Sequence, residues 1–371
     1  MNIAINARLL LHHRLEGIGW HAYEIITRLI QKNPQHQFYL FYDRKENIII
    51  PESKHVTAIT LYPPSRHPVL IHLWCEYSLK KALKKYKIDV FYSPEILMPD
   101  KIKIPTIITV HDLSPLVMPD SIPWSHSRYY RYLIHRNLKL ADHILTVSEF
   151  SKHEIISRCG IEAQKIEVVY NAARNIFKPI SEINKTNIRN EFTQGNPYFI
   201  SIGSIHHRKN IDKVIAAFDT YKQTYHTAHQ LIIAGKFMGL HSTAKQAINQ
   251  SLYKKDIICT GYIDDDRLAA YLGAADALIS LSEYEGFGMP LIEAFSSGVP
   301  VIASDRSCYT EICGGAAVLV QPDRVIDIAA AMQFGLDQKV TLIEKGFSTL
   351  RKYDWDRSAD KISLLINSVL Q

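Results

Sequence analysis

Short apolar runs alternate with amphipathic segments along most of the 371-residue chain. Each run has about the length of a buried strand, and the segments between the runs have helical spacing. This alternation predicts an α/β fold, because buried parallel strands need a helical crossover between them. The runs predicted as strands are residues 2–7, 37–42, 89–92, 106–110, 141–147, 167–170, 198–202, 231–235, 257–261, 277–281 and 299–303.

The length and the pattern together predict two domains, at about 150 residues per domain. The alternation pauses after residue 170 and starts again near residue 198, so residues 171–179 form the predicted linker. We therefore predict one domain at 1–175 and a second at 176–354, each a doubly wound parallel sheet.

The segment SEYEGFGMPLIEAFSSG, residues 282–298, is the richest in candidate chemistry. It follows an apolar run and predicts a loop with Glu285, Gly286, Phe287 and Gly288. A helix then carries Glu293. Glycines allow backbone N–H groups to approach a ligand, and a helix N-terminus favours an anion. Carboxylates accept hydrogen bonds from hydroxyl groups. Phosphate and hydroxyl recognition together indicate a sugar nucleotide.

This segment resembles the donor-site signature of the retaining GT-B glycosyltransferases of family 4. The resemblance rests on EGFG and PLIEAFSSGVPVIAS and extends over nearly the whole chain. It implies two Rossmann-like domains that face a cleft, with a C-terminal helix at about 355–371 packed back on the first domain. It also implies that Glu285 contacts the donor sugar and that Glu293 contacts the nucleotide ribose.

Two cations follow the first strand of the second half, in the loop that starts at Gly203. Arg208 and Lys209 precede a predicted helix, where they are placed to bind a diphosphate. They match the RKN segment of the family, in which these charges stabilise the departing nucleotide diphosphate. His206 and His207 have no carboxylate or cysteine spaced to complete a metal site. We expect no metal cofactor.

His111 follows a predicted buried strand in the segment HDL. The carboxyl end of a strand is where ligands bind in open α/β sheets. The resemblance gives His111 a role at the reacting sugar, with Asp112 orienting the loop or the ring. It also makes Tyr262 and Ile263 candidates for backbone contact with the base.

Gly17 and Gly19 have the spacing of a dinucleotide-binding fingerprint, and Asp43 lies where its ribose-binding acid is expected. A loop that contains His12 and His13 separates the glycines from the strand, however, and these two histidines receive no role. We therefore predict a mobile glycine loop that faces a phosphate or a sugar. A dinucleotide-dependent oxidoreductase, a nucleotide-sugar epimerase and a non-catalytic sugar-nucleotide binder remain as alternatives.

Composition bears on the cellular compartment of the protein and on its contact with membranes. The formal charge is +6, and the five scattered cysteines show no CxxC pair, which fits the reducing cytoplasm. The N-terminus resembles a strand rather than a signal peptide, and no apolar run reaches the ~20 residues of a membrane span. Residues 69–87 combine an apolar stripe with a lysine cluster. We expect a domain helix there, and the alternative is a helix that docks peripherally on the inner membrane.

The predicted reaction moves a hexose from a nucleotide sugar to a hydroxyl group and retains the anomeric configuration. General similarity to mannosyltransferases of bacterial surface polysaccharide assembly favours GDP-mannose, with UDP-hexoses as the alternative donors. The predicted acceptor is a glycan or a polyprenyl-linked glycan, and no nucleic-acid partner is predicted. Family members often have Asn-Gly-Val-Asp at the linker, where this chain has Asn171, Ala172, Ala173 and Arg174.

Overall fold

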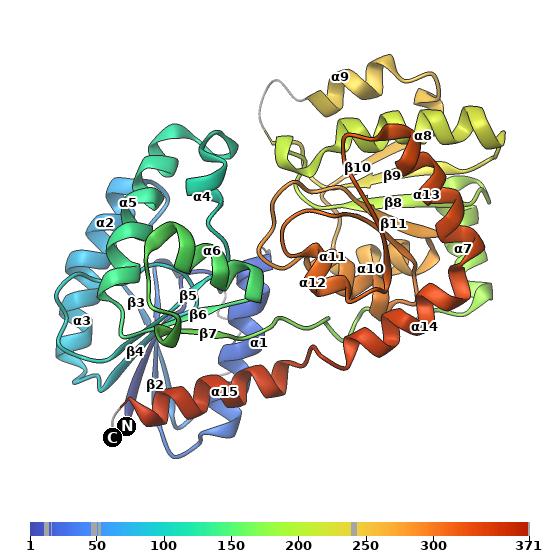
Figure 1. Cartoon of the computed structure of the whole chain (residues 1–371). Helices are drawn as coiled ribbons and strands as arrows, with labels where there is room; N and C mark the ends of the chain where they lie inside the picture. Colours follow the sequence, from blue (N-terminus) through green and yellow to red (C-terminus); the bar gives the residue numbers. More distant parts are fainter. Residues whose placement is uncertain (11–14, 16, 46–49, 51–52, 239–242, 370–371) are drawn as a thin grey trace. The chain divides into compact units, whose positions relative to one another are not determined.

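The chain forms two compact units in the computed structural model (Figure 1). The structure describes residues 1–10, 15, 17–45, 50, 53–238 and 243–369. Unit 1 consists of Met1–Asn171 and Asp354–Gln371, and unit 2 consists of Ala172–Tyr353. The chain therefore passes between the units twice, and the first passage lies a few residues before the predicted boundary at 175.

Unit 1 is built on a seven-stranded parallel sheet with the strand order β3-β2-β1-β4-β5-β6-β7. The order reverses between β1 and β4, and loops that leave the carboxyl ends of such neighbouring strands diverge to form a ligand site. The strands of unit 1 are β1 Asn2–Asn6, β2 Gln37–Tyr42, β3 Val56–Thr60, β4 Val90–Ser93, β5 Thr106–Val110, β6 His143–Thr146 and β7 Ile166–Val168.

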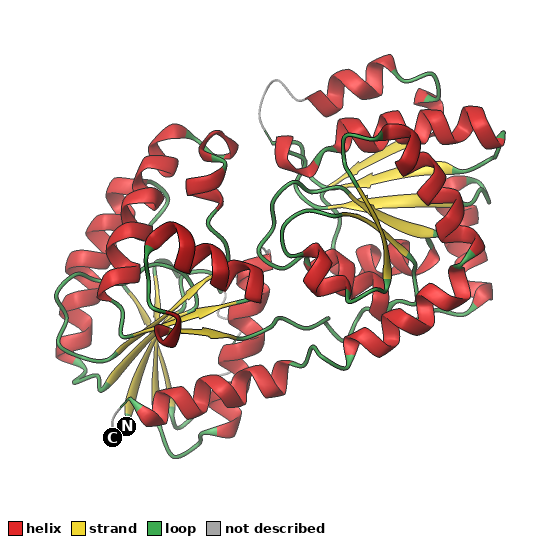
Figure 2. Cartoon of the chain, in the orientation of Figure 1, coloured by secondary structure: helices red, strands yellow, loops and turns green. Residues whose placement is uncertain are grey.

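Helices cover both faces of this sheet (Figure 2). The C-terminal helix belongs to unit 1 and lies along α1, where Lys32 Nζ is 2.7 Å from Asp360 Oδ1 and Ser363 donates to Asn33 Oδ1 at 2.9 Å (Figure 1). The helices of unit 1 are α1 Gly17–Lys32, α2 Pro68–Leu73, the π-helix η1 Trp74–Leu79, α3 Lys80–Lys85, α4 Ser114–Val117, η2 Pro119–Ser121, α5 Trp124–Leu140, α6 Glu149–Cys159, η3 Ala163–Lys165 and α15 Trp355–Ser368.

Unit 2 is built on a six-stranded parallel sheet with the order β10-β9-β8-β11-β12-β13. Here the order reverses between β8 and β11, so the loops after these two strands flank the position where such sheets bind ligands. The strands of unit 2 are β8 Tyr198–Ile202, β9 Gln230–Ala234, β10 Ile257–Gly261, β11 Ala277–Ser280, β12 Val301–Ser304 and β13 Ala317–Val320.

The core of unit 2 joins helices α8 and α13 to the central strands. Phe199 of β8, Phe218 of α8 and Met332 of α13 are fully buried in it. The helices of unit 2 are α7 Glu182–Thr193, η4 His207–Lys209, α8 Ile211–Tyr225, α9 Thr243–Gln250, η5 Lys254–Asp256, α10 Asp265–Ala274, α11 Met289–Ser296, α12 Tyr309–Cys313, α13 Val325–Asp337 and α14 Lys339–Leu350.

One local prediction was wrong, and two strands were missed. Gly17 and Gly19 form the first turn of α1 instead of a mobile loop, because the bare Gly19 lets the helix approach the Leu9 carbonyl. Strands β3 and β13 were missed; both are sheet edges whose residues are largely half-buried, so their apolar pattern is weak. The helix expected at 69–87 is present as a continuous helical run over 68–85, in which η1 is a π-helical stretch between α2 and α3.

Candidate functional site

The loops after β8 and β11 bring three predicted site residues of unit 2 together. Arg208 and Lys209 lie on the short helix η4 that follows β8, and Glu285 lies in the loop that follows β11. Backbone contacts fix the two loops to each other, because Glu283 N donates to Arg208 O at 2.8 Å. The side chain of Asn210 continues this contact by donating to Leu281 O at 2.8 Å.

The two cations converge on one carboxylate oxygen. Arg208 Nη1 and Lys209 Nζ each lie 2.7 Å from Glu285 Oε1. The three side chains are 12–19% exposed, so the contacts are shielded from bulk water. Burial by itself raises the pKa of Glu285, but the Lys209 and Arg208 charges outweigh it and lower that pKa to about 2. Glu285 is therefore an anion at neutral pH, surrounded by two positive charges.

Glycine geometry makes room for this cluster. Gly203 has a φ of +128°, and a Cβ there would lie 3.2 Å from both Cε and Nζ of Lys209. Gly288 has a φ of +91°, and a Cβ there would lie 2.6 Å from the Tyr309 ring. Because L-residues rarely adopt these angles, both positions require glycine for the loops to follow this path.

Glu293 has a cationic partner of its own, Arg174. It is 4% exposed on α11, and its Oε1 accepts from Arg174 Nε at 3.2 Å and from Arg174 Nη2 at 3.1 Å. Burial raises the pKa of Glu293 to about 7, although the Arg174 charge opposes this increase. Glu293 thus changes charge near neutral pH, whereas Glu285 does not.

The remaining predicted residues of unit 2 have different surroundings. Tyr262 is 68% exposed in the loop that it shares with the half-buried Ile263. Phe287 is buried with its ring edge-to-face against Tyr353, so its side chain belongs to the core. Burial and the Arg208 and Lys209 charges lower the pKa of His206 to about 4, which keeps it neutral. Within the described ranges, no three His, Cys, Asp or Glu residues are grouped to hold a metal ion.

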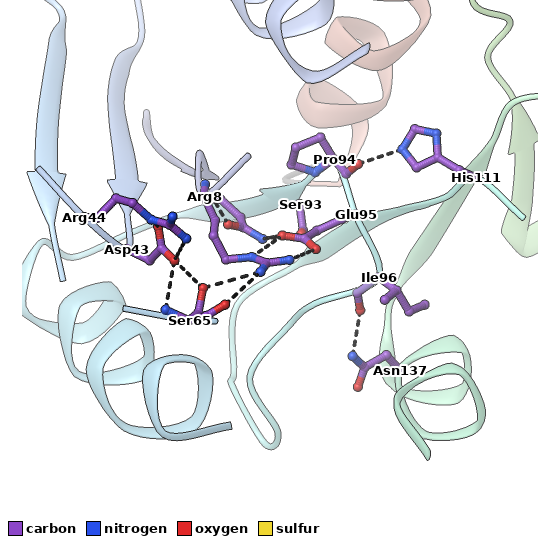
Figure 3. A network of polar contacts seen from close by, with 11 residues as sticks. Arg8, Asp43, Arg44, Ser65, Ser93, Pro94, Glu95, Ile96, His111 and Asn137 are labelled. Carbon is purple, nitrogen blue, oxygen red and sulfur yellow. Dashed lines mark hydrogen bonds and ion pairs between the residues drawn. The ribbon is translucent and has the colours of Figure 1, made fainter. Parts of the chain in front are cut away.

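His111 lies directly after β5 in unit 1, as Figure 3 shows. Its Nε2 is 2.9 Å from the Pro94 carbonyl oxygen. A carbonyl oxygen can only accept, so Nε2 carries the hydrogen and Nδ1 is the acceptor nitrogen. Burial lowers the pKa of His111, which favours this neutral form. Asp112 accepts from Ser114 N at 2.8 Å and thus orients the loop.

A second histidine packs against His111. His21 of α1 is 1% exposed, and its ring lies edge-to-face on the His111 ring with the centroids 4.7 Å apart. Its Nδ1 donates to Asn171 Oδ1 at 2.7 Å. Burial and the neighbouring His111 lower the pKa of His21 to about 3, so it is neutral. His21 thus connects the candidate site in unit 1 to the last residue before the first passage between the units.

A buried polar network supports the loop that carries Pro94 (Figure 3). Arg8 follows β1 and donates to Glu95 Oε1 from Nε at 2.9 Å and to Glu95 Oε2 from Nη2 at 2.5 Å. Asn137 of α5 donates to the Ile96 carbonyl at 2.7 Å. The loop after β4 is thus bonded both to the residue that follows β1 and to α5. This fixes the Pro94 carbonyl, which in turn orients His111.

The predicted dinucleotide features do not form such a site. Asp43 is fully buried and accepts from Arg44 Nε and from Ser65 N, both at 2.9 Å. Its oxygens are therefore engaged within the protein, and Gly17 and Gly19 are helical. His12 and His13 lie outside the described residues.

The sequence predictions missed Arg174, His21, Arg8 and Glu95. For Arg174 a signal existed, since it stands where the family often has an aspartate. Arg8 and Glu95 follow β1 and β4, and recognising them as a pair requires knowing that these two strands are neighbours. His21 lies within an amphipathic helix, and nothing local separates it from an ordinary core histidine.

Comparison with known proteins identifies the family. The family model for glycosyl transferases group 1 matches residues 183–367, and the model for glycosyltransferase family 4 matches residues 15–173. The O-antigen chain mannosyltransferase B of Escherichia coli is 26% identical over 93% of this chain and 94% of its own length. The O-antigen chain mannosyltransferase RfbU of Salmonella typhimurium is 28% identical over 67% of this chain and 65% of its own length.

Solved structures show the same fold at lower identity. Sucrose-phosphate synthase from Thermosynechococcus elongatus aligns with a TM-score of 0.77 and 19% identity, over 100% of this chain and 99% of its own. The Anabaena protein HepE in complex with UDP and glucose aligns with a TM-score of 0.75 and 17% identity, over 99% of this chain and 100% of its own. With both family models matched and the fold shared, the chain belongs to the family 4 glycosyltransferases and is an enzyme with the GT-B fold.

Proposed function

We propose that this glycosyltransferase moves a hexose from a nucleoside diphosphate sugar to a hydroxyl group with retention of the anomeric configuration. The observation that carries the proposal is the convergence of Arg208 and Lys209 on Glu285 at the switch point of unit 2. Two shielded cations at this position suit a diphosphate, and the adjacent carboxylate suits the sugar hydroxyls. The same cations would stabilise the diphosphate as it leaves.

His111 gives the proposal a specific atom in unit 1. Because its Nε2 donates to Pro94, the ring can accept a hydrogen bond only at Nδ1. A neutral nitrogen that accepts a hydrogen bond suits a hydroxyl of the donor sugar or of the acceptor substrate. It does not act as an acid. In the proposed mechanism the departing phosphate takes the proton of the attacking hydroxyl, so no protein carboxylate has to serve as the base.

GDP-mannose is the donor that we favour. Its support is the naming of two relatives as O-antigen chain mannosyltransferases. UDP-sugars are the alternative, because solved structures of the fold include complexes with UDP and UDP-glucose. The proposed acceptor is a hydroxyl of a glycan or polyprenyl-linked glycan in surface polysaccharide synthesis.

The test is thermal-shift binding with GDP-mannose, UDP-glucose, an ADP-sugar and a dTDP-sugar, each with and without EDTA. A ligand that binds only the folded state raises the melting temperature. We expect a shift with one nucleotide class, undiminished by EDTA because the predicted chemistry needs no metal. The variant Glu285→Gln should lose most of this shift. The absence of any shift across the panel would contradict the donor site.

Peripheral contact with a membrane is a further part of the proposal for unit 1. Trp74, Leu79 and Leu83 are buried, as expected for a domain helix. On the same segment Val69 and Tyr77 are 59% and 66% exposed, close in sequence to the lysines of α3. Sedimentation with anionic liposomes should decrease when Lys81, Lys84 and Lys85 are changed to Gln, and unchanged sedimentation would contradict the contact. No helix in the described part of the chain has the length and apolarity needed to cross a bilayer.

A further inference from the structure

Arg174 lies at the start of unit 2 and joins three separate segments. It is 6% exposed, and two of its nitrogens contact Glu293 Oε1 at 3.1 and 3.2 Å. Its third nitrogen, Nη1, lies 2.8 Å from Asp265 Oδ1 in the first turn of α10. One guanidinium therefore connects the linker to α11, which carries Glu293, and to α10.

Packing holds this guanidinium in place. It lies over the ring of Phe177 at 4.8 Å from the centroid, and Phe177 is 2% exposed. Ser296, at the end of α11, donates to the Phe177 carbonyl at 2.7 Å. The linker segment is thus attached to α11 at two points, through the Arg174 side chain and through the Phe177 backbone. Arg174 cannot turn away from Glu293 without disturbing both.

The two carboxylate oxygens of Glu293 differ in their hydrogen-bond partners. Oε1 accepts both N–H groups of Arg174, while Oε2 has no hydrogen-bond partner among the described residues. A carboxylate that is buried without a cation takes up a proton, because burial disfavours its charged form. The Arg174 charge opposes the protonation of Glu293. Asp265 in turn holds Arg174 through its contact with Nη1.

We propose that Arg174 is the positioning residue of the donor site, which keeps Glu293 ionised and turns its Oε2 toward the vicinal ribose hydroxyls of a nucleoside diphosphate. This inference rests on the proposed function. A carboxylate oxygen accepts two hydrogen bonds, and a vicinal diol supplies two donors, so the anion matches this ligand. A protonated Glu293 would be a neutral partner and would lose the stronger hydrogen bonds that an ionised carboxylate accepts, so it would bind the diol less tightly.

The pH dependence of nucleotide binding distinguishes this role from a structural one. Burial and the opposing Arg174 charge place the pKa of Glu293 at about 7. Affinity should therefore increase as the pH rises through 7, when Glu293 loses its proton. Without the Arg174 charge, the pKa of Glu293 rises further, so the increase in nucleotide affinity should occur at higher pH.

The experiment measures the Kd of GDP and UDP by calorimetry at pH 6, 7, 8 and 9 for the full chain. Arg174→Met should weaken binding at pH 7 by about tenfold or more, with partial recovery at pH 9. Arg174→Lys keeps the charge but loses the paired contacts, and should retain the wild-type pH midpoint with weaker binding. The matched control is Arg267→Met, which removes an exposed arginine from α10 and should bind as the wild type does.

A wild-type Kd and pH profile in Arg174→Met would overturn the proposal. If that variant does not fold, as judged by its circular dichroism melting curve, Arg174→Gln replaces it, because glutamine keeps a donor without the charge. A wild-type profile in Arg174→Gln would overturn the proposal equally. If the wild-type protein itself binds neither nucleotide at any pH, the proposed function fails and the inference fails with it. That result is recognisable because it appears before any substitution.

Discussion

The polar clusters at the carboxyl ends of the two sheets differ in how many cations contact each carboxylate. In unit 1, one cation meets one carboxylate, and Arg8 binds both oxygens of Glu95. In unit 2, two cations share a single oxygen of Glu285. The first cluster is balanced within the protein and acts as a frame. The second gathers two cations around one carboxylate, an arrangement that is suited to a ligand anion.

Buried charged residues that support the fold differ from those placed for a ligand in how their charges are paired. Removal of one partner from a buried ion pair of one cation and one carboxylate is strongly destabilising, because the remaining charge is buried without a partner. Two cations at the carboxyl end of a sheet are placed to stabilise charge that develops on a ligand. We therefore expect substitutions in the unit 1 cluster to lower stability and substitutions in the unit 2 cluster to lower activity.

The largest effect is expected for Arg8→Met, which leaves the Glu95 carboxylate buried and unpaired. We expect a loss of roughly 3–5 kcal/mol in the free energy of unfolding, measured by urea titration. The control is Arg158→Met, whose partner Glu154 forms a pair at the surface and whose loss should cost ~0–1 kcal/mol. Equal small losses in the two variants would mean that the Arg8–Glu95 pair is not the frame described above.

The next effect is expected for Lys209→Ala, measured as kcat with the donor identified by thermal shift. Removal of one group that stabilises transition-state charge typically costs about 2.7–4 kcal/mol, or a hundredfold to a thousandfold in kcat. Stability should change little by comparison. Lys213→Ala serves as the control, since that lysine lies on α8 and pairs with the exposed Asp323. A change in KM with kcat preserved would place Lys209 outside the chemical step.

The smallest effect concerns the free energy of unfolding of Glu285→Gln and Glu293→Gln relative to the wild type. It should depend on pH in opposite directions for the two variants, by on the order of 1–3 kcal/mol each. The folded-state pKa of Glu285 is about 2, below the ordinary value of 4.5, so its contribution to stability is lost as the pH falls from 4.5 to 2. The destabilisation caused by Glu285→Gln should therefore shrink over that range. The folded-state pKa of Glu293 is about 7, so its contribution is lost as the pH rises from 4.5 to 7.

Glu293→Gln should consequently gain stability relative to the wild type as the pH rises over that second range. Urea unfolding at pH 3, 5, 7 and 8 measures both trends. Parallel pH profiles for Glu285→Gln and Glu293→Gln would contradict the different surroundings of the two carboxylates.

The candidate site residues of unit 2 could be proposed from the sequence because their positions follow local patterns. Buried strands are recognisable as apolar runs, and Arg208, Lys209 and Glu285 each come shortly after one. The helix starts follow local chemistry as well, since the side chains of Ser148 and Asp264 cap α6 and α10. Edge strands β3 and β13 were missed, because partial exposure weakens the pattern.

The partners of these residues could not be predicted in the same way. Arg174 and Glu293 are 119 positions apart, and Arg8 and Glu95 are 87 positions apart. Such pairs depend on strand order and on the direction of each side chain, and neither is present in local spacing. The tautomer of His111 similarly depends on a carbonyl of the neighbouring loop.

The return of the chain to unit 1 has a consequence for biosynthesis. Unit 2 is one continuous segment, whereas unit 1 is completed only by α15, which follows Tyr353. At ribosomal rates of about 5–20 residues per second, roughly 10–40 s separate the synthesis of Asn171 from that of α15. During this time the surface of α1 that α15 covers is open to water and to chaperones. The nascent chain thus completes its second unit before its first.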